Sequence, residues 1–185
     1  MTIAYISHPD CVKHQMGRHH PECPERLGAI EDQLLLSGIS GLLAHHEAPL
    51  ATREQITRVH PDSYFESIID ASPQEGLVQL DPDTSMCPDS LNAAMRAAGA
   101  AVLATDLVID GRAQTAFCGV RPPGHHATRN RSMGFCLFNN VAVAAMHALE
   151  HHGLERVALV DFDVHHGNGT EEIFAGDGRA VMVGV

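Results

Sequence analysis

The sequence is poor in basic residues. It contains 12 Lys and Arg against 23 Asp and Glu, which gives a formal net charge of −11 when the histidines are neutral. A protein that grips nucleic acid needs positive charge to neutralise phosphates, so this balance argues against nucleic acid as a direct partner. A cationic ligand is easier to accommodate.

Paired cysteines and long apolar runs are also absent. The chain has five cysteines, an odd number, and none of them forms a C-x-x-C pair. This usage indicates reduced thiols rather than a disulfide framework. The first ten residues lack a basic start followed by a long apolar core, and no later run reads as apolar over a membrane-spanning length. We therefore expect a cytoplasmic protein with no membrane partner.

Length and pattern predict one α/β domain over residues 1–185. With 44% hydrophobic residues, the chain can form one sizeable core, and no internal repeat or low-complexity linker divides it. Strand-like and helix-like segments alternate, which implies a parallel sheet covered by helices on both faces. The predicted strands are 3–6, 43–47, 114–120, 156–163 and 181–185. The predicted helices are 24–36, 52–59, 61–71, 90–108, 139–152 and a short one from Thr170, and 74–90 is predicted as a long loop.

The most informative stretch is an apolar strand-like run that ends in DFDVHHGNGT. Side chains alternate along a strand, so Asp161, Asp163 and His165 are expected on one face, with the apolar residues between them on the other. A carboxylate and an imidazole two residues apart on one face can hold one metal ion. The sequence thus predicts a metal site at the end of this strand.

A histidine pair follows the strand predicted at 114–120. His125 and His126 lie in RPPGHHA, where two prolines and a glycine stiffen the loop at the carboxyl end of the strand. Open parallel sheets bind ligands at that edge. A neutral imidazole beside a metal-bound water can take its proton. Such a histidine needs an acceptor that fixes its tautomer, and Asp161 and Asn168 are candidates.

Histidine doublets alone predict nothing, because the chain has five. They begin at His19, His45, His125, His151 and His165. His151 and His152 stand where a helix is expected to end before Gly153, and interaction with the negative helix end explains them without a catalytic role. His45 and His46 have no partner motif and are treated likewise.

Three motifs together resemble those of the zinc-dependent histone deacetylase family, especially its class II and bacterial deacetylase-like branch. They are RPPGHHA at 121–127, GFCLFNN at 134–140 and DFDVHHGNGT at 161–170, in this order and spacing. Less specifically, HPECPERL at 20–27 resembles the entry segment of that branch, and the stretch from Asp83 to Pro88 resembles its substrate-rim loop. The resemblance covers nearly the whole chain.

The resemblance implies a three-layer fold of the arginase/deacetylase type and a zinc-dependent amidohydrolase. Its substrate would be acetyl-lysine or another acetylated amine. One Zn²⁺ per site is implied, with Asp163 and His165 as ligands. His125 and His126 would be the paired histidines beside the metal-bound water, with His126 as the general base.

Further roles come from the same resemblance. Asp161 would orient His125, and Asn168 would orient His126. Gly134 and Phe135 would line the substrate tunnel, and Arg26 would stand near the exit channel for acetate. A structural K⁺ is implied near the main chain of Asp161, Asp163 and His165. The resemblance is also compatible with a homo-oligomer.

The sequence departs from the family at its carboxyl end. A third zinc ligand, a second tunnel phenylalanine and an oxyanion tyrosine in a Gly-Gly-Tyr segment have no match, and Tyr5 and Tyr64 lie in no such motif. The run 181–185 reads as a central strand that is cut off. We therefore expect an amino-terminal portion, roughly half of a deacetylase domain, with an unpaired apolar sheet edge, weak zinc binding and slow turnover.

Other functions stay open. Manganese ureohydrolases of the arginase type share the fold but use an Asp-x-His-x-Asp pattern for two metals, and Gly167 stands where the second aspartate would be. An inactive metal-binding or interaction module is another alternative. Among deacetylases, the sequence does not separate acetyl-lysine, acetylpolyamine and small acyl substrates.

Overall fold

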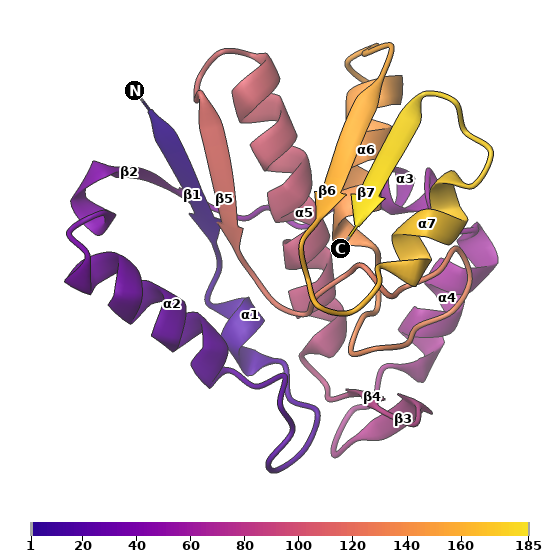
Figure 1. Cartoon of the computed structure of the whole chain (residues 1–185). Helices are drawn as coiled ribbons and strands as arrows, with labels where there is room; N and C mark the ends of the chain where they lie inside the picture. Colours follow the sequence, from indigo (N-terminus) through magenta and orange to yellow (C-terminus); the bar gives the residue numbers. More distant parts are fainter. Residues whose placement is uncertain (1, 185) are drawn as a thin grey trace.

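The chain folds as alternating strands and helices, as the sequence predicts for an α/β protein (Figure 1). The computed structural model describes residues 2–184, so Val185, the end of the last predicted strand, lies outside the described residues. The helices are α1 (Asp10–Lys13), α2 (Glu25–Leu36), α3 (Arg53–Thr57), α4 (Asp62–Ala71), α5 (Ser90–Ile109), α6 (Asn140–Glu150) and α7 (Asn168–Phe174), with a 3-10 turn at Ser40–Leu42.

The main strands form two parallel groups. In the first, β1 (Ile3–Ser7) lies between β2 (Leu43–Glu47) and β5 (Thr115–Gly119) and runs parallel to both. In the second, β6 (Val157–Asp161) pairs in parallel with β7 (Ala180–Gly184). Within residues 2–184 no ladder joins β5 to β6, and Figure 1 shows α5 in the gap between the two groups and α6 behind β6.

The two groups differ in how well they are covered. In β1 three consecutive residues, Ala4, Tyr5 and Ile6, are buried, so both faces of this strand are packed. In β6 only Leu159 is buried, while Val160 is 69% exposed. Phe162, just after β6, is 87% exposed. Apolar side chains are therefore exposed on one face of β6 and in the loop that follows it, and within residues 2–184 β6 and β7 pair only with each other, which leaves each strand with one unpaired edge.

Helix α5 forms the centre of the packing. It contacts β1, β5 and α6, and its alanines at 93, 97 and 100 are fully buried. Among the described residues it is also the one helix that is long and apolar enough to cross a membrane by length and composition. This differs from the expectation that no run is apolar over a membrane-spanning length. A core helix has the same composition, because it packs small apolar residues on several sides.

Local sequence signals locate several helix ends correctly. Thr52 and Gln55 form a capping box at the start of α3. Asn139 caps α6 by accepting the N–H of Ala142 at 3.0 Å. Gly153 follows the end of α6 with a φ of 69°, the left-handed conformation expected of a helix stop. All five cysteines are free.

Two predictions of secondary structure are wrong. The predicted long loop at 74–90 contains an antiparallel hairpin of β3 (Val78–Asp81) and β4 (Thr84–Met86). The strand predicted at 156–163 ends at Asp161, because the Asp161 carboxylate accepts the N–H of Asp163 at 3.2 Å and the chain turns off the sheet. Asp163 and His165 therefore lie in a loop, and strand alternation does not place them.

Candidate active site

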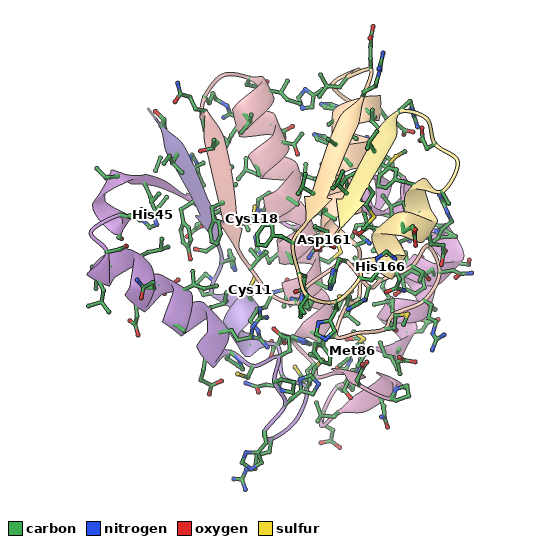
Figure 2. All side chains as sticks on the ribbon, viewed as in Figure 1. Cys11, His45, Met86, Cys118, Asp161 and His166 are labelled. Carbon is green, nitrogen blue, oxygen red and sulfur yellow. The ribbon has the colours of Figure 1, made fainter. Side chains whose placement is uncertain are left out.

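A cleft of about 240 Å³ lies at the carboxyl ends of β5 and β6 and gathers most of the predicted site residues. The loop after β5 delivers the histidine pair, and the loop after β6 delivers the predicted metal ligands. Figure 2 shows Asp161 at the end of β6. The residues that line the cleft are His125, His126, Gly134, Phe135, Asp163 and His165, together with Pro21, Glu22, Arg26 and Pro123.

The two predicted hydrogen-bond partners of the histidine pair are in place. The Nδ1 atom of His125 lies 2.9 Å from Oδ2 of Asp161, and Nδ1 of His126 lies 2.6 Å from Oδ1 of Asn168. The two imidazole rings are 4.0 Å apart at their centroids. Both acceptors are oxygens, so each Nδ1 carries the proton and each Nε2 is left with a lone pair. The two rings of the pair therefore have different partners, one a carboxylate and one an uncharged amide.

Asp163 and His165 converge although they lie outside the strand. The N–H of His165 donates to Oδ1 of Asp163 at 2.8 Å, and Nδ1 of the same histidine lies 3.1 Å from that oxygen. The backbone hydrogen bond from His165 lowers the pKa of Asp163, which keeps this carboxylate ionised as a metal ligand must be. The second histidine of the doublet, His166, points instead to Glu171, with Nε2 and Oε2 2.9 Å apart.

This donor pair fits a zinc ion. Bonds of 2.0–2.1 Å in a tetrahedron place neighbouring ligand atoms roughly 3.3 Å apart, close to the 3.1 Å between the Asp163 oxygen and the His165 nitrogen. Glu22 is the other carboxylate that lines the cleft, but Arg121 holds both of its oxygens. The described residues of the cleft thus offer two zinc ligands.

The rim is built from segments far apart in the sequence. Asp83 accepts the N–H of Gly134 at 3.1 Å, and the Thr84 hydroxyl accepts the N–H of Phe135 at 2.9 Å. The ring of His20 packs edge-on against Phe135, with centroids 4.6 Å apart. Gly134 has a φ of 56°, and a Cβ at this position would overlap the ring of His126. Because Gly134 has no side chain, the rim can lie directly against the ring of His126.

Sequence reasoning missed a buried ion pair that supports the cleft. Arg121 and Glu22 are almost fully buried, and the guanidinium donates from Nε and Nη2 to the two carboxylate oxygens at 2.5 and 2.6 Å. Arg121 also donates to the carbonyl oxygens of Cys11 and His14 at 2.9 and 3.1 Å. The pair therefore ties the amino-terminal segment to the loop of the histidine pair. The only signal was that both residues lie in recognised motifs.

Comparison with known proteins agrees with this geometry. The family model described as "Histone deacetylase domain" matches residues 20–185. The chain belongs to the histone deacetylase domain family. This family assignment and the α/β fold with a parallel sheet confirm the resemblance that the three motifs carried.

Members of the histone deacetylase family match at 34–43% identity in the following cases. The histone deacetylase-like amidohydrolase of Pseudomonas aeruginosa is 43% identical over 155 residues, covering 84% of this chain and 40% of the relative. The human polyamine deacetylase HDAC10 is 37% identical over 187 residues, covering 96% of this chain and 28% of the relative. The crystal structure of the HDA15 HD domain superposes with a TM-score of 0.94 at 34% identity, covering 99% of this chain and 52% of that one.

The chain spans about half the length of the relatives it matches, or less. The part of the histone deacetylase domain that this chain spans contains the histidine pair, its two acceptors and the loop with Asp163 and His165. Arg26 also adjoins the cleft, where its Nη1 donates to Glu22 at 3.2 Å and its side chain is half exposed. The roles of these residues in catalysis stay predictions.

Proposed function

We propose that this chain provides the histidine pair, two zinc ligands and part of the substrate tunnel of a zinc-dependent deacetylase. The reaction is hydrolysis of the acetyl amide of lysine or of another acetylated amine, giving the free amine and acetate. One observation carries the proposal: two imidazoles with different acceptors lie beside a converging carboxylate and imidazole, in a single cleft. Relatives named as an amidohydrolase and as a polyamine deacetylase support the same class of reaction.

His126 is the proposed general base. Its Nδ1–H donates to the amide oxygen of Asn168, which does not stabilise an imidazolium as a carboxylate would. With Nδ1 carrying this proton, the free Nε2 can take a proton from the attacking water. After the attack, the same Nε2–H can pass the proton to the nitrogen of the departing amine.

His125 differs because its partner is charged. The Nδ1–H of His125 donates to the carboxylate of Asp161, which fixes the orientation of the ring. The oriented ring lies beside the position where negative charge develops on the carbonyl oxygen of the substrate. His125 thus assists by electrostatics, while His126 moves the proton.

Asp163 and His165 are the proposed zinc ligands, and further ligands would come from outside the described residues of the cleft. Zinc at this position would polarise the substrate carbonyl and lower the pKa of a bound water toward about 7. We also propose a monovalent K⁺ at the main chain near Asp161, Asp163 and His165, where it would stiffen the loop.

Gly134 and Phe135 are proposed to line the tunnel that receives the acetylated side chain. Phe135 stands at the cleft, where its ring can lie along an extended aliphatic stem, and His20 packs against this ring from outside the cleft lining. Arg26 is proposed to attract the acetate product. We also propose that the protein is located in the cytoplasm. Two copies of it would associate through the exposed sheet edge.

A zinc-dependence assay tests the proposed function. The assay uses the protein expressed from this reading frame. We expect its hydrolysis of acetyl-lysine peptide or acetylpolyamine to stop when a chelator is added and to return when Zn²⁺ is added. The His165→Ala variant should not recover with Zn²⁺, because one ligand is missing. Release of acetate is the measurement. Folded protein that shows no zinc-dependent hydrolysis of any of these substrates would favour a binding module.

A further inference from the structure

Three histidines outside the candidate active site converge at the far end of α6. His147, His151 and His152 each offer a ring nitrogen, and these three atoms lie within 4.8 Å of one another. None of them is among the residues that line the cleft. Helix α6 begins beside the site and ends at the cluster, and its 11 residues span roughly 16 Å. The cluster is therefore separate from the candidate active site.

The spacing of the histidines produces the cluster. His147 and His151 are four residues apart and share one face, and their rings stack with centroids 4.6 Å apart and an interplanar angle of 13°. The ring of His152 is nearly perpendicular to both, with centroids 5.1 and 4.9 Å away. Imidazole is a preferred ligand of Zn²⁺, Cu²⁺ and Ni²⁺.

Asp106 of α5 supplies negative charge to the cluster. Its Oδ1 lies 2.7 Å from Nε2 of His147 and 2.7 Å from Nε2 of His152. Carboxylates that hold imidazoles in this way orient metal-binding histidines, and they offset the charge of the ion. Asp106 and His147 also lie in the last turns of α5 and α6, where the free carbonyl groups favour a cation.

The cluster is open to solvent on one side. His147 is buried. His151 is exposed and His152 is partly exposed. Tetrahedral zinc needs ligand atoms roughly 3.3 Å apart, and rotation of the exposed His151 ring can close the remaining distance.

Arg58 is the group that opposes a cation here. Its Nη1 lies 3.1 Å from Nδ1 of His147. Its Nη2 donates to Oε1 of Glu54 at 2.7 Å, and the Glu54 side chain is 80% exposed. The guanidinium can therefore turn toward Glu54 and leave the histidine when a metal ion binds.

We propose that His147, His151 and His152, with Asp106 beside them, form a second metal site for a divalent ion of the zinc class. The ion fastens the end of α6 to α5, at a distance from the cleft, so its role is structural. The proposal does not rest on the deacetylase function, because no residue of the cleft takes part in it.

The test uses untagged chain that carries Asp163→Ala and His165→Ala, which removes the proposed catalytic zinc ligands. Zn²⁺ is titrated against a chromogenic chelator, and the visible spectrum of bound Co²⁺ reports the coordination. We expect one Zn²⁺ to bind. Adding His151→Ala and His152→Ala should weaken this binding by at least about 100-fold, the upper range for losing a supporting residue.

The matched control is His45→Ala with His46→Ala. These two residues form another doublet with the same pattern of exposure, and Figure 2 shows His45 on β2 at the left of the view, away from α6. This control should bind Zn²⁺ unchanged, and Arg58→Met should bind it several-fold more tightly. Absence of Zn²⁺ binding by folded protein, or binding that survives the loss of His151 and His152, would overturn the proposal.

Discussion

Replacing His126 with alanine is expected to slow hydrolysis of the acetylated substrate by about 10²- to 10⁴-fold, the range for loss of a positioned general base. The ring is held by Asn168 through Nδ1, and its Nε2 is the free base that faces the cleft in the proposed mechanism. Zinc binding should change little, because Asp163 and His165 remain. The measurement is the rate of acetate release at saturating Zn²⁺, beside a zinc titration of the same variant.

His166→Ala is the control for this substitution. His166 is also the second member of a doublet, but it points to Glu171 and away from the cleft. Its removal should leave the rate within about twofold, as expected for a surface substitution that removes no active-site group. Equal losses for the two variants, or a His126→Ala protein with the original rate, would contradict the role of His126.

Replacing Arg121 with methionine is expected to lower the free energy of unfolding by about 3–5 kcal/mol. Its partner Glu22 is buried, so the substitution removes the buried guanidinium that holds both carboxylate oxygens and leaves only the half-exposed Arg26 and the ring of His14 near this charge. The carbonyl oxygens of Cys11 and His14 also lose their donor. Urea denaturation followed by circular dichroism measures the loss.

Arg26→Met separates the buried pair from an ordinary contact with the same carboxylate. Arg26 also donates to Glu22, but its side chain is 50% exposed, so we expect a loss of only about 0–1 kcal/mol. Combining Arg121→Met with Glu22→Leu should restore part of the stability, because the buried charge is removed with its partner. A stability of Arg121→Met equal to that of Arg26→Met would refute a structural role for the pair.

The sequence was sufficient for the parts of the site that are local. The motifs around His125 and Asp161 follow parallel strands, and such strands deliver their loops to the same edge of a sheet. This rule predicts that Asp161 and Asn168 lie near the histidine pair, and the family resemblance assigns Asp161 to His125 and Asn168 to His126, as the structure has them. The helix caps at Thr52 and Asn139 were equally local, since each depends on residues within one turn.

Other features depend on contacts that no local pattern encodes. Strand β6 ends earlier than predicted because the side chains of Asp161 and Asp163 accept backbone N–H groups. The alternation of apolar and polar residues does not predict these hydrogen bonds. Arg121 and Glu22 lie 99 residues apart in the chain, and their burial follows only from tertiary packing. The hairpin of β3 and β4 was not predicted, because the prolines and the glycine within residues 74–90 are typical of a loop.

The histidines at the end of α6 show the same limit. Helix-end charge was a sufficient explanation for His151 and His152 when only the sequence was considered. The structure adds Asp106 from another helix and His147 from the buried face of the same one. The sequence around His151 and His152 does not indicate a metal site. The packing of α5 against α6 places them in the proposed ligand set.

A zinc titration followed in histidine-ring spectra tests most directly whether Asp163 and His165 share one ion in the cleft. In ¹⁵N-labelled chain that carries His151→Ala and His152→Ala, added Zn²⁺ should shift the ring nitrogens of His165. The Nδ1–H signals of His125 and His126 should persist, because Asp161 and Asn168 hold them. Asp163→Ala should abolish the response. Saturating Zn²⁺ that leaves the His165 ring unmoved would contradict the proposed zinc site.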